Sequence, residues 1–113
     1  SLSYKDALKL AAQDLDNLLQ IEEASWPGST FLDVEFKSNA AVATINRNHP
    51  FFNEFYDFLR HSDDSKGFEA LKILMLAFAR TEDVLLHKVG QEKFEEIRDK
   101  WGAYMKELAK LSS

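Results

Sequence analysis

The sequence has no cysteine and only 2 prolines and 4 glycines among its 113 residues. The lack of cysteine excludes a disulfide scaffold, thiol catalysis and cysteine-ligated metal sites. The glycines form neither a GxGxxG pattern nor a Gly-Lys-Ser or Gly-Lys-Thr triplet, so a nucleotide phosphate loop of these kinds is excluded. No apolar run approaches 18 residues, and we therefore expect no membrane-spanning segment.

Charge and composition narrow the class of protein further. The 14 Lys and Arg against 19 Asp and Glu give a net charge of −5, which argues against a mainly electrostatic binder of nucleic acid or anionic membrane. With 45% hydrophobic residues, the chain can bury about two thirds of its unfolded surface in one core. The start SLSYKDALKL lacks the order of a signal peptide, so we expect a cytoplasmic protein. Because the sequence begins at Ser1 rather than Met, we also expect it to be part of a longer chain.

The first half of the chain shows two kinds of periodicity. Over residues 2–24, apolar side chains recur at helical spacing, which predicts an amphipathic helix ending before Pro27 and Gly28. The stripe of this helix contains Leu8, Leu15 and Leu18. From residue 31 the pattern alternates with a period near 2, which predicts an antiparallel β-hairpin over 31–46.

Three further helices are predicted, over residues 50–60, 68–88 and 91–111. The segment from Ile73 to Ala79 is apolar almost all round, which is typical of a central helix. The last helix carries apolar residues at heptad spacing, namely Phe94, Ile97, Trp101, Tyr104, Leu108 and Leu111. The prediction is a single α+β domain over residues 1–113, with four helices and one antiparallel β-hairpin.

Self-association is the simplest way to cover what such a fold leaves exposed. An isolated hairpin is marginal in water, and its free edges are a candidate association surface. We therefore predict a homodimer, formed through the hairpin edges at Val42 or through the stripe of Leu8, Leu15 and Leu18. A different protein partner is the alternative. Membrane and nucleic-acid partners are not expected.

The corner Asn46, Arg47, Asn48 and His49 is the densest set of hydrogen-bonding side chains, and it lies between a predicted strand and a predicted helix. Loops in such positions often carry function, so we predict a binding site at these four residues. The structural alternative is that Asn46 and Asn48 turn the chain while His49 and Pro50 open the helix.

No pattern in the sequence indicates catalysis. There is no nucleophile elbow or paired-acid arrangement, and no catalytic residue is predicted. Asp83 with His87, and His61 near Asp63, offer metal-ligand types without a third ligand at a recognised spacing, so no metal site is predicted. His87 beside Asp83 also allows a phosphoacceptor or regulatory module as an alternative.

One stretch resembles a known family. The phrase Ile45-Asn46-Arg47-Asn48-His49-Pro50-Phe51, the Leu/Ala-rich segment 70–80 and Trp101-Gly102 resemble the C-terminal region of bacterial and phage ATP-binding proteins. These proteins belong to the histidine-kinase-like ATPase superfamily shared with gyrase and heat-shock chaperones.

The resemblance implies a non-catalytic C-terminal accessory module that mediates dimerisation or partner contact. ATP and Mg²⁺ would then bind an N-terminal domain, and no cofactor is expected within residues 1–113. No ATP-site residue can be carried over, because the sequence lacks the Asn-bearing helix and the Gly-rich lid. The alternative is a stand-alone small α+β protein.

Overall fold

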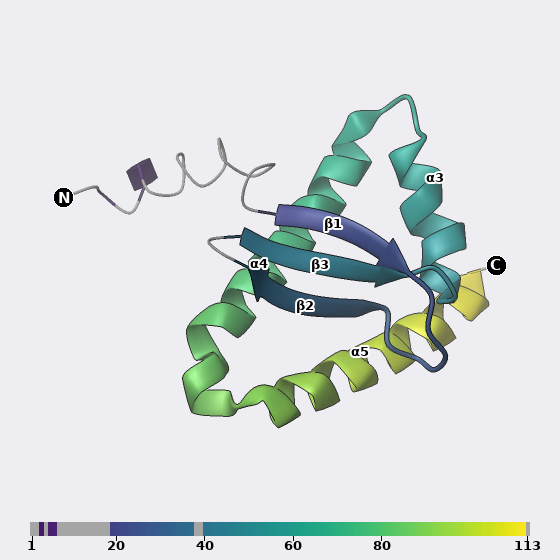
Figure 1. Cartoon of the computed structure of the whole chain (residues 1–113). Helices are drawn as coiled ribbons and strands as arrows, with labels where there is room; N and C mark the ends of the chain where they lie inside the picture. Colours follow the sequence, from purple (N-terminus) through teal and green to yellow (C-terminus); the bar gives the residue numbers. More distant parts are fainter. Residues whose placement is uncertain (1–2, 4, 7–18, 38–39, 113) are drawn as a thin grey trace.

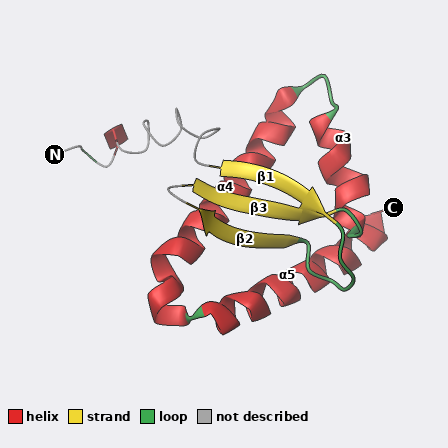
Figure 2. Ribbon diagram, viewed as in Figure 1, coloured by secondary structure: helices red, strands yellow, loops and turns green. Residues whose placement is uncertain are grey.

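A three-stranded mixed sheet forms the centre of the molecule (Figures 1 and 2). The computed structural model describes residues 3, 5–6, 19–37 and 40–112. The strands are β1 (Leu19–Ala24), β2 (Leu32–Lys37) and β3 (Ala40–Asn46), in the spatial order β1-β3-β2. β2 and β3 pair antiparallel, as the predicted hairpin requires, whereas β1 pairs with β3 in parallel.

The parallel strand β1 overturns the prediction of four helices with one antiparallel hairpin. Residues 19–24 fall within the first predicted helix, but they form an extended strand in which Ile21 lies opposite Ala43. Parallel pairing joins segments that are distant in sequence, so local helical spacing gives no sign of it. The α+β class remains correct. Of the rest of the predicted helix, residues 2, 4 and 7–18 lie outside the described residues.

The helices follow the sheet in sequence. Their bounds are η1, a π-helix at Phe52–Tyr56, then α3 (Asp57–Arg60), α4 (Ser65–Val89) and α5 (Gln91–Ser112). Asp64 caps α4, since its side chain accepts a hydrogen bond from the Lys66 backbone N–H at 3.0 Å. Gly90, with a φ of 90°, separates α4 from α5. None of the described helices is both long and apolar enough to cross a membrane.

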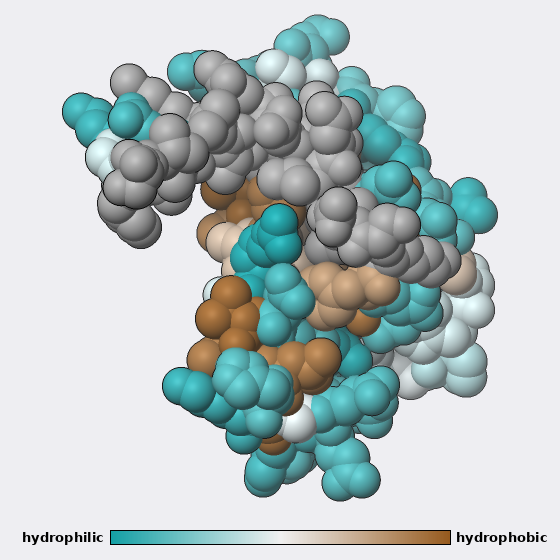
Figure 3. Space-filling view, turned by 60° about the vertical axis from the view of Figure 1, so that its left-hand side comes forward, coloured by the Kyte–Doolittle hydropathy of each residue, from teal (hydrophilic) through white to brown (hydrophobic). Residues whose placement is uncertain are grey.

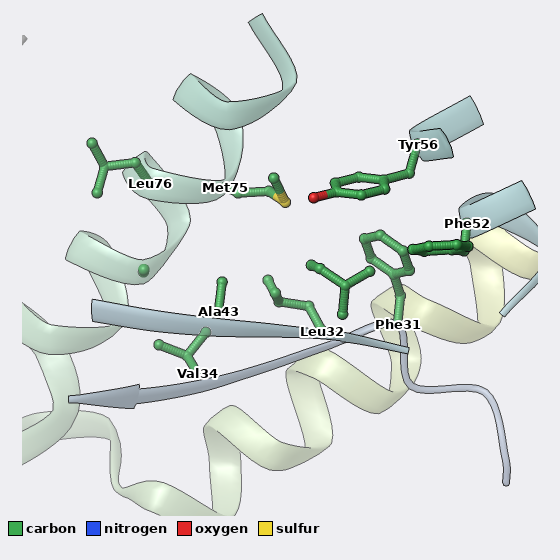
Figure 4. Close-up of a cluster of buried hydrophobic side chains, with 10 residues drawn as sticks. Phe31, Leu32, Val34, Ala43, Phe52, Tyr56, Met75 and Leu76 are labelled. Atoms are coloured by element: carbon green, nitrogen blue, oxygen red, sulfur yellow. The ribbon is translucent and has the colours of Figure 1, made fainter. Parts of the chain in front are cut away.

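The main core lies between the sheet and α4, which runs behind the sheet in Figure 1. Tyr56 stacks on Phe52 at 5.3 Å between ring centroids, and its hydroxyl end points toward Met75 of α4 (Figure 4). The cluster comprises Phe31, Leu32, Val34, Ala43, Ile45, Phe52, Tyr56, Met75, Leu76 and Ala79. α5 lies along the β2 side of the sheet, so the two long helices diverge from Gly90 (Figure 1).

α4 is not the central helix that its composition predicted. Met75 and Ala79 are buried, but Ile73 is 55% exposed and Leu74 is 68% exposed. Only one face of the helix meets the sheet because three strands provide a single covered face. Other apolar side chains of α4, such as Ile73, Leu74 and Val84, therefore lie at the surface of the described structure.

Candidate functional site

Asn46 ends β3 and is completely buried. Its Oδ1 accepts hydrogen bonds from the backbone N–H groups of Trp26 (3.2 Å) and Asn48 (3.0 Å). Its Nδ2 donates to the carbonyl oxygen of Thr30 at 2.9 Å. One side chain therefore joins the loop between β1 and β2 to the turn that follows β3, and the geometry gives Asn46 a structural role.

His49 is also buried, at 1% exposure. Its Nδ1 accepts a hydrogen bond from the Phe51 backbone N–H at 3.1 Å, which leaves Nε2 to donate to the carbonyl oxygen of Gly102 at 2.8 Å. Burial lowers the pKa of His49 below 6.5, and the charge of Lys106 lowers it further, against an opposing effect of the Gly102 carbonyl. The neutral ring thus links the start of η1 to the middle of α5.

Arg47 and Asn48 are the exposed members of the predicted site. Arg47 Nε lies 3.3 Å from Glu23 Oε1, with 60% of the arginine side chain exposed. Asn48 Nδ2 lies 3.4 Å from the carbonyl oxygen of Trp26. The structure therefore brings the four residues together in one turn but exposes only two of them to a ligand. Binding at this turn stays a prediction.

Asp83 and His61, which were considered for metal chemistry, have partners of their own in the structure. Asp83 pairs with Arg80 at 3.2 Å, and His87 is exposed in the last turn of α4. His61 Nδ1 lies 2.9 Å from the carbonyl oxygen of Asp57. Among the described residues, no three His, Cys, Asp or Glu side chains are placed to hold one metal ion. The phosphoacceptor role of His87 stays a prediction.

Of the residues predicted to mediate self-association, the structure describes only Val42. Val42 is 1% exposed in the central strand β3, between Gln20 of β1 and Glu35 of β2. The addition of β1 to the predicted hairpin therefore removes Val42 from a free edge. Leu8, Leu15 and Leu18 lie outside the described residues.

Apart from Phe94, which is buried, the heptad-spaced residues of α5 point away from the core. Tyr104 is 70% exposed, Leu108 63% and Leu111 82%, while Ile97 and Trp101 are about two fifths exposed. The buried side of α5 instead consists of Phe94, Arg98, Gly102 and Ala109. The sequence contained a sign of this, because Arg98, Gly102, Met105 and Ala109 form their own row at helical spacing.

Small residues on that row let α5 approach the rest of the fold closely. A Cβ atom on Gly102 would lie 2.2 Å from the carbonyl oxygen of Ser29 and 3.0 Å from the backbone nitrogen of Phe31. The helix therefore packs backbone to backbone against the loop before β2. This close approach turns the bulky heptad-spaced side chains outward.

The exposed face of α5 continues onto α4. Trp101 stacks on Phe78 of α4, with ring centroids 5.3 Å apart and an interplanar angle of 22°. Leu74 lies one turn before Phe78 and is 68% exposed. We define the α4/α5 surface as the half-buried Phe78 and six exposed apolar residues: Leu74, Ile97, Trp101, Tyr104, Leu108 and Leu111. Figure 3, a view of the molecule from another side, shows that hydrophobic residues also lie at the surface there, bordered by hydrophilic residues.

A buried ion pair, which the sequence reading missed, lies where α4 and α5 meet. Arg98 donates to Oε1 of Glu82, and the two side chains are 7% and 5% exposed. Arg98 Nη2 also lies 3.4 Å from Asp33 Oδ1 on β2. One guanidinium therefore joins three elements of the fold.

Comparison with known proteins adds no relative. No family model matches the chain, and neither the curated proteins nor the solved structures contain a match. The resemblance of residues 45–51 to the ATPase superfamily thus stays a prediction, and the function has to be argued from the surfaces described above.

Proposed function

We propose that this chain is a non-catalytic interaction module that associates with a second copy of itself through the α4/α5 surface. The observation that carries the proposal is the outward orientation of the heptad-spaced residues of α5, such as Tyr104, Leu108 and Leu111. A helix normally turns its apolar stripe toward the core. Here the stripe is exposed while Arg98 is buried, which supports a role for the stripe outside the monomer.

The size and chemistry of the side chains support an interface. Contiguous apolar patches on a monomer are typical of surfaces that bind other proteins. Trp101 and Tyr104 are residue types that dominate interface energetics, and the stacking of Trp101 on Phe78 holds the indole in one orientation. The α4/α5 surface therefore combines an ordered aromatic centre with aliphatic residues around it.

Charge along α5 favours a second copy as the occupant. The exposed charged residues of its first half are mostly acidic: Glu92, Lys93, Glu95, Glu96, Asp99 and Lys100. The second half carries Lys106, Glu107 and Lys110, a net positive set. Two α5 helices packed antiparallel about a twofold axis would place each acidic half beside the partner's basic half.

The proposal is tested by the mass of the protein in solution. Light scattering after size-exclusion chromatography should give twice the chain mass at about 100 μM, with dissociation on dilution. Leu108→Lys should shift the protein to the monomer, because the new charge would be buried in the pairing. Leu108 is 63% exposed in the monomer, so this variant should keep the fold.

The matched control is Glu107→Lys, which introduces the same side chain at the neighbouring exposed position of α5, outside the heptad-spaced row. It should leave the dimer largely intact. A wild-type protein that stays monomeric at about 100 μM contradicts self-association. A dimer that survives Leu108→Lys contradicts the assignment of the surface.

A wider proposal rests on the family resemblance alone. If the chain is the accessory module of an ATP-binding protein, the association described above would pair the ATPase domains attached to it. Sequencing the reading frame upstream of Ser1 tests this: an ATP-site helix followed by Gly-rich loops would support it. A start codon within a few residues would leave self-association of residues 1–113 as the proposed function.

A further inference from the structure

One flank of the exposed apolar row of α5 carries charge, and the other flank is buried. Lys93, Lys100 and Glu107 recur every seven residues, each directly before a member of the heptad-spaced row, and all three are exposed. The opposite flank contains Gly102 and Ala109, which are buried. A second copy that packs on the row therefore meets the charged flank.

The buried flank decides how two α5 helices can pair. About a twofold axis, parallel helices set the charged flank of one against the opposite flank of the other, whereas antiparallel helices set like flanks together. Gly102 packs so closely on the loop before β2 that a Cβ atom on it would lie 2.2 Å from the Ser29 carbonyl oxygen. That flank is thus covered by the chain's own loop. Only antiparallel pairing lets the two charged flanks meet.

Lys100 and Glu107 have no charge partner within the described part of the chain. Lys93, by contrast, has its Nζ 3.8 Å from Glu96 Oε2. Lys100 and Glu107 are about 10 Å apart along the helix axis, beyond the spacings of three and four residues at which helical side chains meet. Both charges are therefore free to pair with a second copy.

We propose that two copies pair through α5 in a single antiparallel register, with Trp101 level with the partner's Tyr104 and Lys100 paired with the partner's Glu107. The inference rests on the self-association proposed above and names the residues that specify its geometry. In this register Lys100 lies about 3 Å along the axis from the partner's Glu107, two residues away. The twofold axis repeats the contact, so the dimer gains two ion pairs.

The same register matches the exposed row with itself. It sets Ile97 level with the partner's Leu108 and Trp101 level with the partner's Tyr104, and all four side chains are exposed in the monomer. A shift of the partner by seven residues in one direction would set Tyr104 level with the partner's Phe94, which is buried in its own fold. The proposed register therefore covers more of the exposed row.

Charge disfavours the shifted registers as well. A shift by seven residues in one direction would set Lys100 against the partner's Lys100, and a shift in the other direction would set the two Glu107 side chains together. Like charges in contact oppose pairing, so Lys100 and Glu107 select the register in addition to stabilising it. Lys93 would meet the partner's Glu107 only in the register that brings the two Lys100 side chains together.

The first test is a charge exchange in the full chain, read from the Kd of self-association by sedimentation equilibrium. Lys100→Glu and Glu107→Lys each set like charges at both symmetric contacts. Each should raise the Kd about fivefold, a change that still leaves a dimer at about 100 μM. The double variant exchanges the two charges, so its Kd should return to within about twofold of the wild-type value.

Lys93→Glu is the matched control on the same flank of α5. The proposed register sets Lys93 level with the partner's Ser112 rather than with a charged residue, so the Kd should equal that of wild type. The shifted register that joins Lys93 to Glu107 predicts a higher Kd instead. Lys93, Lys100 and Glu107 are exposed, so all of these variants should keep the fold.

The second test reads the orientation from cross-links, because the sequence contains no cysteine. Lys100→Cys, labelled with ¹⁵N, is mixed with unlabelled Glu107→Cys, and a short bis-maleimide joins neighbouring thiols. Mass spectrometry then identifies the chains in each product. The mixed product should exceed the Glu107→Cys homodimer about fivefold, because the proposed register holds the two Glu107 positions about 13 Å apart along the axis.

The outcomes separate the register from self-association itself. A wild-type chain that stays monomeric at about 100 μM contradicts the self-association proposed above, and the register with it. A wild-type dimer overturns the register alone in any of three cases: the double variant fails to restore the Kd, Lys93→Glu raises it, or most cross-links join identical positions.

Discussion

His49 Nε2 lies 2.8 Å from the carbonyl oxygen of Gly102, although the two residues are 53 positions apart in the sequence. The bond joins the turn after β3 to the middle of α5. Gly102 meets the loop before β2 within the same region, because its Cα faces Ser29 and Thr30. The amphipathic helix α5 is thus held against the sheet end of the fold by contacts of His49 and Gly102, and its bulky side chains point outward.

The stability of the fold should fall as the pH drops below about 6.5. The pKa of His49 is lowered by burial, so the unfolded chain takes up the proton before the folded chain does. The contribution of the neutral ring is complete above 6.5 and is lost as the pH falls from there toward the lower folded-state pKa. The loss is at most about 1.4 kcal/mol per pH unit.

Urea unfolding at intervals between about pH 7.5 and 5.5 measures this slope. His49→Gln should be less stable at pH 7.5 and should show a flatter dependence in the same interval, because the titrating ring is gone. His87→Gln, a change at an exposed position of α4, is the control and should keep the wild-type slope. Equal slopes for wild type and His49→Gln would contradict the assignment.

Gly102→Ala should lower the free energy of unfolding by about 1–3 kcal/mol. The new methyl group would lie 2.2 Å from the Ser29 carbonyl oxygen, so the helix and the loop have to separate. Gly67→Ala is the matched control within α4, where the nearest atom is the flexible Leu59 Cδ2 at 2.9 Å. The control should be neutral or stabilising, since alanine is the better helix former by about 1 kcal/mol. Similar losses in both variants would rule out the close approach as the cause.

Asn46→Asp should destabilise the fold by about 1–3 kcal/mol, although it preserves the shape of the side chain. The oxygen that accepts from Trp26 and Asn48 remains, but the donor to the Thr30 carbonyl becomes a carboxylate oxygen facing another oxygen. Asn48→Asp, at the exposed neighbouring position, should cost far less. Thermal unfolding of the two variants side by side makes the comparison. Equal losses would show that the Thr30 bond contributes little.

The elements that sequence reasoning predicted well are those determined by local spacing. The two long helices and the β2–β3 pairing follow from periodicity and from turn residues such as Gly90. The prediction for β1 was wrong because β2 lies between β1 and its partner β3 in the sequence. A parallel edge strand is stabilised by such distant pairing rather than by the preferences of its own residues. Local patterns do not record such pairings.

For the candidate surfaces too, the sequence shows the spacing of the residues but not the long-range contacts that decide which of them are buried. The heptad spacing of Trp101, Tyr104 and Leu108 was visible in the sequence, but its direction was not, because the contact at Gly102 decides which side of α5 faces inward. The pairing of Glu82 with Arg98 was likewise hidden, since charged residues are usually read as a solvated face. The turn at residues 46–49 was located correctly, while only the structure separates its buried members from its exposed ones.

Arg98→Met should cost about 3–5 kcal/mol, because it leaves the Glu82 carboxylate buried without its cation. Glu82→Leu should also destabilise the fold, since the guanidinium keeps only Asp33, which is half exposed. The double variant should recover most of the loss, because two apolar side chains remove both buried charges together. Urea unfolding of the four proteins closes the cycle. Losses that simply add would show that Glu82 and Arg98 act independently, and the shared guanidinium would then not be what joins α4 to α5.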